Sequence, residues 1–329
     1  MHTVALSESL FEGVISFRRG TDWLQPLRLN ATEIPLYHEA FVDRAVMTGG
    51  CRLRFRTDAV SIILDVEPEA AEGHRLFDLT TDAARLATFV LLPGGREIRF
   101  DDLPPGDKVL ELWLPTHREV RLRALRINGG AALVPAPDTR PRWTTYGSSI
   151  THCAASHSPS RTWPAVAARL RGLNVTSLGY GGQCHMDTLV AMMIRDRPAD
   201  FISLKVGINM VGSTAAPRTF RPLLIGMVRI IREKHPQTPI VIISPIISPP
   251  RETTPGPTGM TLCLIRQELV TAVERLRACG DTQIHYVSGL DLFGPDLVAD
   301  YLPDLLHPNG DGYERMGANF ASQVIDHIL

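Results

Sequence analysis

The residue types that acyl transfer requires stand at two places in the chain, one near its middle and one near its end. Ser149 follows a β-prone run at 143–147, and Asp304 precedes His307 by three residues. A serine hydroxyl is a weak nucleophile until a base takes its proton, and histidine can do so near neutral pH. An aspartate at this spacing can accept the imidazole Nδ1–H and hold the ring in the useful tautomer. The pattern predicts Ser149 as the nucleophile, His307 as the general base and Asp304 as the group that orients the base.

Acyl transfer also needs donors arranged around the developing oxyanion, and two further segments offer them. Gly182 closes the segment 179–182, and Asn209 closes the tripeptide Gly207-Ile-Asn209. We predict that the backbone N–H groups of Ser149 and Gly182 and the side-chain amide of Asn209 form the oxyanion hole. Glycine at 182 would let the backbone approach a substrate closely.

The segment around Ser149 resembles the nucleophile motif of the SGNH/GDSL hydrolase family. The family motif reads Gly-Asp-Ser-Ile-Thr, and this chain has Gly147-Ser-Ser-Ile-Thr151, with Ser148 in place of the usual aspartate. Asp304 and His307, with the Pro-Asn that follows them, are similar to the last block of the family.

The two middle blocks of that family are matched as well, and in the right order. Gly182 matches the glycine of the second block, and Asn209 matches the asparagine of the third, with Met210 where many members carry aspartate. The resemblance implies a cofactor-free serine hydrolase whose catalytic part has a three-layer α/β/α, flavodoxin-like fold. It also implies a small acyl group, such as acetyl on a sugar or on another hydroxylated small molecule.

Three other residues near these blocks are candidates for contacting a substrate: Tyr180, His185 and Arg251. Arg251 lies in the proline- and glycine-rich segment 248–259, which is long for a connection after a strand. We expect this segment to border the site as a lid or substrate wall or, alternatively, to be an inert surface loop. In the first case Arg251 would be available to a negatively charged group.

Histidines and cysteines near Ser149 raise the question of a bound metal. They are His152, Cys153, His157, Cys184 and His185. Their spacing fits no common zinc pattern, and we predict that they line the pocket or pack, without a metal. The sequence also has no dinucleotide fingerprint and no phosphate-binding loop, so we expect no nucleotide cofactor.

Residues 140–329 alternate between strand patterns and helix patterns. The strand patterns lie at 174–180, 201–208, 239–246 and 284–290, and the helix patterns at 162–173, 220–231, 261–279 and 309–328. This alternation predicts a parallel sheet with helices on both faces. The candidate groups named above follow predicted strands, so they should meet at the carboxyl edge of that sheet.

Residues 1–139 show short strand patterns separated by turns. The run 51–56 alternates apolar residues with arginine, which is typical of a half-buried strand. We predict an antiparallel sandwich of jelly-roll type that ends at a proline-rich linker around 135–141. Through 75–79 and 110–115, this part resembles the β-rich domain that precedes the catalytic domain in one branch of the family. It would act as a packing domain or as a wall that limits substrate size.

Composition limits the partners that can be expected. The 329 residues carry a formal net charge of −1, so neither nucleic acid nor an acidic membrane is expected as a partner. The five cysteines are scattered and odd in number, which argues against a disulfide framework. The first residues show no secretory signal, and no apolar run reaches membrane-spanning length, so we expect a cytoplasmic protein without a membrane segment.

The predicted function is that of a serine esterase whose substrate is a small-molecule ester or an acylated carbohydrate. An acyltransferase or thioesterase remains open, because another acceptor can replace water in the second step while the catalytic residues stay the same. A non-catalytic glycan-binding protein is the alternative from a different class.

Overall fold

The computed structural model describes residues 1–69, 73–212 and 214–329, and its contacts separate the chain into two compact units. The first unit comprises Met1–Arg140 with Ser158–Arg161, and the second comprises Pro141–His157 with Thr162–Leu329. The domain ranges predicted above, 1–139 and 140–329, stay a prediction. Within the described residues, no helix combines the length and the apolar character that crossing a membrane requires.

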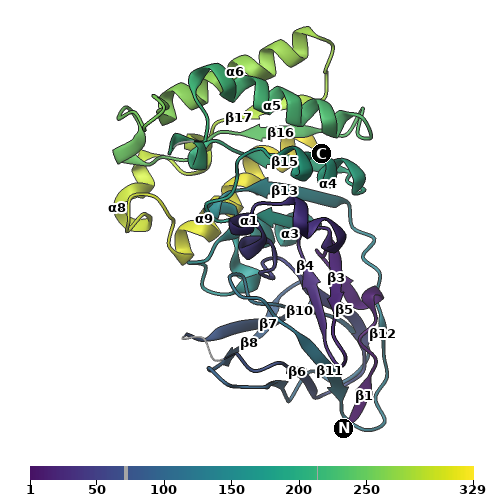
Figure 1. The fold of residues 1–329 in the computed structure, drawn as a ribbon. Coiled ribbons are helices and arrows are strands. Elements are labelled where there is room, and N and C mark those ends of the chain that lie inside the picture. The colour runs from purple at the N-terminus through teal and green to yellow at the C-terminus, as the bar shows by residue number, and fades with distance from the viewer. Residues whose placement is uncertain (70–72, 213) are drawn as a thin grey trace. The chain divides into compact units, whose positions relative to one another are not determined.

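The first unit is built from two antiparallel sheets (Figure 1). One contains β1 (His2–Val4), β3 (Ser16–Arg19), β4 (Leu24–Leu27), β6 (Ile62–Val66), β9 (Glu97–Phe100) and β11 (Leu122–Ile127). The other contains β2 (Phe11–Glu12), β5 (Arg52–Thr57), β7 (Arg75–Thr80), β8 (Arg85–Leu91), β10 (Lys108–Trp113) and β12 (Leu133–Pro135). The first sheet has the order β3-β4-β11-β6-β9 with β1 on β11, and the second has the order β12-β5-β10-β7-β8 with β2 on β5. A short helix, α1 (Glu39–Ala45), lies between β4 and β5 in the chain.

Both sheets contribute to one hydrophobic core. Phe55 of β5 and Leu112 of β10 are buried in the same cluster as Leu64 of β6 and Leu125 of β11. Because side chains alternate across a strand, each sheet supplies one apolar face to this core. The predicted β-sandwich is confirmed.

Strand β5 departs from the expectation of a half-buried strand, because two of its arginines lie inside. Arg52 and Arg54 are only 1% and 8% exposed. Oε1 of Glu111, on the neighbouring β10, lies 3.4 Å from Arg52 Nε and 2.9 Å from Arg54 Nη1. Asp138 and Arg140 pair beside them and complete the cluster. Buried charges are tolerated when they are paired, so these arginines do not mark a solvated face.

The second unit has a parallel sheet in which the chain adds strands first on one side of the first strand and then on the other. Its strands are β13 (Arg142–Gly147), β14 (Asn174–Gly179), β15 (Phe201–Lys205), β16 (Ile240–Ile243) and β17 (Ile284–Val287). They are arranged β14-β13-β15-β16-β17, and every neighbouring pair is parallel. The chain leaves β13 for β14 on one side and then crosses to β15 on the other. The carboxyl end of β13 is therefore the topological switch point, where open α/β sheets bind their ligands.

Helices flank this sheet in two groups (Figure 1). They are α2 (Ser149–His152), α3 (Trp163–Arg171), α4 (Thr188–Asp196), α5 (Pro217–Arg232), α6 (Leu262–Ala278), α7 (Gly289–Leu292), α8 (Val298–Tyr301), α9 (Gly310–Phe320) and α10 (Asp326–Ile328). Helices α4, α5 and α6 pack in a row, and α3 packs with α9. Parallel crossovers are right-handed, so the reversal at β13 puts α3 and α4 on opposite faces. The predicted three-layer α/β/α fold is confirmed.

Strand ends differ from the predicted ones where the apolar pattern runs past the sheet. The strand predicted at 201–208 ends at Lys205, although Val206 is still buried. The residues beyond it form the 3₁₀ turn Ile208–Val211. Because burial continues past the last paired residue, periodicity alone overestimates the length of this strand.

Candidate active site

The turn after β13 presents Ser149 at the start of a short helix. Ser148 is the N-cap of α2, and its Oγ accepts a hydrogen bond from the Ile150 N–H at 3.3 Å. Gly147 leaves no room for a side chain, because a Cβ there would lie 2.2 Å from Thr151 Oγ1. Strand end and helix are packed tightly as a result. Ser148 is buried, whereas Ser149 is partly exposed.

Ser149 and the acid–histidine pair form a continuous run of hydrogen bonds. Ser149 Oγ lies 2.9 Å from His307 Nε2, and His307 Nδ1 lies 2.7 Å from Asp304 Oδ2. Asp304 Oδ1 accepts the backbone N–H of His307 at 2.6 Å and that of Leu306 at 3.0 Å. The three residues that the sequence indicated for catalysis are thus brought together. With the Nδ1 proton donated to the carboxylate, Nε2 is left to accept the serine proton.

Asp304 keeps its negative charge in this setting. Partial burial acts to raise the pKa of its carboxyl, but hydrogen bonds from His307 and Leu306 hold that pKa below its ordinary value of 3.8. The carboxylate is therefore ionised across the neutral range and can stabilise positive charge on the imidazole.

The candidate oxyanion donors follow β13, β14 and β15, which are neighbours in the sheet. A Cβ placed on Gly181 would lie 3.7 Å from the Cβ of Ser149, so the loop that carries Gly182 lies against Ser149. Asn209 Oδ1 accepts the Cys184 N–H at 3.0 Å. This bond ties the two loops together and turns the amide so that its NH₂ group can serve as a donor. The geometry is compatible with an oxyanion hole at this edge.

His152, expected from the sequence only to pack or line the pocket, also holds the loop that carries Gly182. Its side chain is buried, and its Nδ1 accepts the Gly181 N–H at 3.3 Å. The end of β14 comes so close that a Cβ on Gly179 would lie 2.3 Å from His152 N. The sequence shows only a histidine three residues after Ser149, and no spacing rule assigns such a histidine to holding a loop.

Two glycine substitutions should distinguish the energetic cost of a steric clash from the cost of an unfavourable backbone conformation. Gly179→Ala drives a methyl group into the backbone of α2, so we expect a loss of unfolding free energy of about 3 kcal/mol or more. Gly182→Ala meets no atom within 4 Å. Its φ of +73° is unfavourable for alanine, at a cost of about 1–2 kcal/mol. Urea denaturation of both variants checks that Gly179→Ala loses more unfolding free energy than Gly182→Ala. A Gly179→Ala protein as stable as the wild type would show that the end of β14 can move away from α2.

The three predicted substrate contacts have different surroundings. The prediction for Tyr180 is wrong, because its side chain is fully buried and its ring packs 6.2 Å from that of Tyr146. His185 is partly exposed, and its Nδ1 lies 2.9 Å from Thr214 Oγ1. Arg251 is half-buried and donates a hydrogen bond within its own loop. Substrate contact by His185 and Arg251 stays a prediction.

The segment 248–259 is anchored along its length. Both carboxylate oxygens of Glu252 accept from Arg266 of α6, at 2.5 and 3.0 Å. Thr258 Oγ1 donates to the carbonyl oxygen of Ala215 at 2.6 Å. These bonds favour a fixed wall or a packed loop over a mobile lid.

Metal-ligating residue types occur near the site, but their surroundings account for them without a metal. Burial raises the pKa of the Cys153 and Cys184 thiols, that of Cys184 to about 12. A protonated thiol is a poor ligand. Among the described residues, His157, Asp311 and Glu314 bring ligand atoms within 4.8 Å of one another. His157 Nε2 already makes a hydrogen bond with Asp311 Oδ1 at 2.8 Å, so this histidine nitrogen has a partner without a metal. The predicted absence of a metal stays a prediction.

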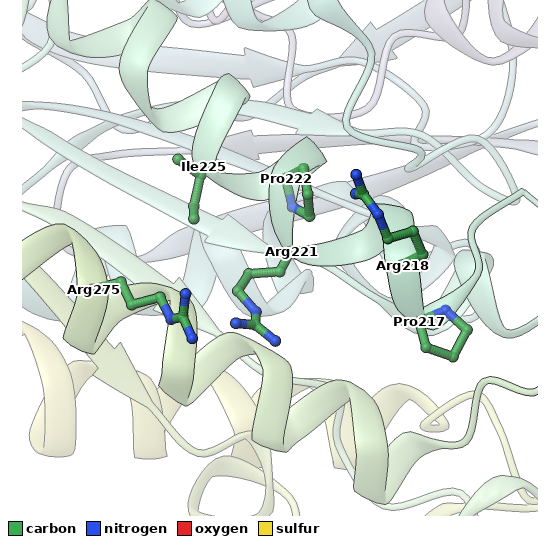
Figure 2. Close-up of a pocket in the computed structure, with 6 residues that line it drawn as sticks. All are labelled: Pro217, Arg218, Arg221, Pro222, Ile225 and Arg275. Carbon is green, nitrogen blue, oxygen red and sulfur yellow. The ribbon is translucent and has the colours of Figure 1, made fainter.

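A groove of about 320 Å³ lined by α5 and α6 shares no residue with this site (Figure 2). Its lining residues are Pro217, Arg218, Arg221, Pro222, Ile225 and Arg275. Arg221 is paired with Glu268 at 2.7 Å. The guanidinium group of Arg218 lies apart from those of Arg221 and Arg275 (Figure 2). The guanidinium groups therefore do not converge on one anion, and we assign the groove no part in the chemistry.

Known proteins resemble the second unit in sequence and the whole chain in structure. A family model described as GDSL-like lipase/acylhydrolase matches residues 142–326. The salicylyl-acyltransferase SsfX3 from a tetracycline biosynthetic pathway has 35% sequence identity, with 99% of this chain and 97% of that chain covered and a TM-score of 0.91. No match was found among curated proteins.

Two more distant structures share the fold. A Bacteroides ovatus protein assigned as a GDSL-like lipase has 21% identity and a TM-score of 0.77, with 96% of this chain and 95% of that chain covered. A family two carbohydrate esterase from Clostridium thermocellum has 15% identity and a TM-score of 0.68, with 85% of this chain and 93% of that chain covered. At these identities the likeness extends to the fold alone.

Proposed function

The chain belongs to the GDSL-like lipase/acylhydrolase family, and from this premise we propose that it is a serine esterase acting on short-chain acyl esters of a sugar or another hydroxylated small molecule. The observation that carries the proposal is the run of hydrogen bonds at 2.9 and 2.7 Å from Ser149 through His307 to Asp304. A hydroxyl, a base and an orienting carboxylate in this order are what activation of a serine requires.

In the first half of the reaction, Ser149 Oγ attacks the ester carbonyl carbon and its proton passes to His307 Nε2. The carbonyl oxygen becomes an oxyanion, which the donors of the oxyanion hole stabilise. Collapse of this intermediate breaks the bond to the alcohol. The alcohol leaves with the proton from His307, and the acyl group remains on Ser149.

In the second half, water attacks the acyl-enzyme and gives its proton to His307. The second tetrahedral intermediate collapses to release the carboxylic acid, and Ser149 regains its proton. Asp304 accepts the Nδ1 hydrogen bond throughout, so that its charge stabilises the imidazolium formed in each half.

Acyl transfer to an acceptor other than water is the second candidate, and one observation favours it. The relative with 35% identity over 99% of this chain is named as an acyltransferase. Only the second half of the reaction would differ, since an alcohol or amine would replace water. Incubation with an activated ester and graded concentrations of acceptors separates the two functions. Transfer product that rises with acceptor supports transfer, and release of the free acid at every concentration supports hydrolysis.

The proposed substrate class is tested with aryl esters graded from acetyl to octanoyl, with a salicylyl ester beside them. We expect the acetyl ester to give the highest kcat/KM. A maximum at octanoyl would overturn the short-chain assignment, and a maximum at the salicylyl ester would point to an aromatic acyl group. No turnover of any ester, together with no labelling by a fluorophosphonate, would favour the glycan-binding alternative.

Replacement of Asn209 should expose its role as an oxyanion donor. Asn209→Ala removes the donor and the bond to the Cys184 N–H, whereas Asn209→Asp removes the donor but keeps an acceptor oxygen. Loss of one such donor typically lowers kcat by about 10²–10³-fold, so we expect both variants to fall by that order. If only the alanine variant is slow, Asn209 acts by holding the loop and not by donating to the oxyanion.

A further inference from the structure

The turn between Asp304 and His307 contains an unfavourable backbone conformation. Leu305 has a φ of +60°, in the left-handed region that L-residues rarely adopt. This conformation folds the chain back over Asp304, so that Oδ1 can accept both the Leu306 and the His307 N–H. Leu305 is 41% exposed, so its side chain is not part of the hydrophobic core. The turn therefore depends on contacts made by its backbone.

Ser248 supplies such a contact from the loop after β16. Its Oγ donates to the Leu305 carbonyl oxygen at 2.7 Å. The side chain is 1% exposed, so water does not compete for this bond. Arg251 Nη1 donates to the same Oγ at 3.0 Å, which leaves the hydroxyl hydrogen directed at Leu305. A charged donor behind the hydroxyl also polarises it and strengthens the bond that it makes.

Ser248 is in turn fixed to α6 and to the segment that follows β16. Its N–H donates to Glu252 Oε1 at 3.0 Å, and Glu252 is held by Arg266. Arg266 also donates to the carbonyl oxygens of Pro245 and Ile246, both at 3.2 Å. Partial burial acts to raise the pKa of the Glu252 carboxyl, but hydrogen bonds from Arg266 and Ser248 hold it below 4.5. A chain of hydrogen bonds thus runs from α6 through Glu252 and Ser248 to the turn at 304–307.

We propose that Ser248 is a positioning residue for the catalytic base, because its hydroxyl fixes the Leu305 carbonyl and so keeps Asp304 within reach of His307 Nδ1. The proposal rests on the catalytic roles proposed above for Asp304 and His307. Ser248 acts through the turn, and it is not one of the groups that touch the reacting atoms. Without its hydrogen bond, Leu305 is free to leave the left-handed region, and the carboxylate then moves away from the imidazole.

Steady-state kinetics of two variants test this role. For an aryl acetate, Ser248→Ala should lower kcat by about tenfold, the upper range for one hydrogen bond, with KM unchanged. Ser248→Thr keeps a hydroxyl on an extended backbone of φ −146° and ψ 91°, so its kcat should return toward that of the wild type. If the alanine variant does not fold, Ser248→Cys, which is similar in size but a weaker donor, takes its place with the same expectation.

A double-mutant cycle distinguishes positioning from a general structural effect. In an Asp304→Asn background the orienting carboxylate is already gone. Adding Ser248→Ala should therefore lower kcat further by less than about twofold. The same tenfold loss in that background, or a wild-type kcat for Ser248→Ala alone, overturns the proposal. Ser149→Ala is measured beside them. If it stays active, the proposed function fails; if it is inactive while Ser248→Ala is at full rate, only the positioning role fails.

Discussion

Ser149→Ala should lower kcat/KM for aryl acetates by at least about 10³-fold and leave the fold intact. The alanine keeps the Cβ and the backbone N–H, and α2 is capped by Ser148, so neither the helix nor the oxyanion donor is lost. What disappears is the oxygen that lies 2.9 Å from His307 Nε2. Initial rates across a range of ester concentrations, together with the rate of labelling by a fluorophosphonate, measure the loss.

The neighbouring serine provides a matched control for that result. Ser148→Ala removes the cap bond to the Ile150 N–H, which costs about 1 kcal/mol of stability, but it keeps the proposed nucleophile. We expect this variant to be labelled and to retain most of its activity. Equal rates for Ser149→Ala and the wild type would refute the mechanism, and a larger loss at 148 than at 149 would move the nucleophile by one residue.

The carboxyl edge of the parallel sheet was predictable because its strands are buried on both faces. Such strands read as short apolar runs, so the residues that follow them can be located in the sequence. Asn209 follows the apolar pattern predicted at 201–208, whereas Ser149 and Gly182 follow β-prone segments at 143–147 and 174–180 that also contain threonine or serine. Once the strands are parallel neighbours, the three residues necessarily share an edge. The structure adds the bond between Asn209 and the Cys184 N–H, which the strand pattern does not contain.

Burial of polar side chains was not predictable from periodicity. Arg52 and Arg54 are buried because Glu111, more than fifty residues away in the chain, faces them across the sheet. An alternating pattern gives the residue types along one strand and does not indicate which charged partners another strand supplies. The prediction that Tyr180 contacts the substrate is wrong for a related reason. The neighbours of Tyr180 in sequence belong to the loop that carries Gly182, yet its own side chain is fully buried.

The residues that support the site were missed because their roles come from pairing between distant loops. Ser248 and Leu305 are 57 positions apart, and His152 and Gly181 are 29 positions apart. Sequence motifs describe short, fixed spacings, and neither of these pairs has one. The residues proposed for the reaction have characteristic chemistry, whereas those that hold them in place are ordinary residues with particular neighbours. The substrate is equally hard to infer, since hydrolysis and acyl transfer use the same catalytic groups.

His307→Ala should abolish most activity, and Asp304→Asn should cost less. The alanine variant lacks the base that accepts the Ser149 proton, and we expect a loss of at least about 10³-fold in kcat/KM. Asp304→Asn keeps that base but removes the negative charge and presents an amide NH₂ or a neutral oxygen to Nδ1. The ring is then poorly oriented and its cation is less stabilised. In a comparable triad, removal of the acid costs about tenfold to a hundredfold less than removal of the base.

Added imidazole distinguishes these two losses. In His307→Ala the space of the ring is vacated beside a partly exposed serine, so free imidazole can enter and act as the base. We expect its addition to raise the rate of His307→Ala and to leave Asp304→Asn unchanged, because there the position of the ring is already filled. Rates are measured at constant pH and ionic strength over a range of imidazole concentrations, with Ser149→Ala as the background for direct catalysis by imidazole. A slower Asp304→Asn than His307→Ala, or rescue of both to the same degree, would contradict the assignment of His307 as base and Asp304 as its orienting group.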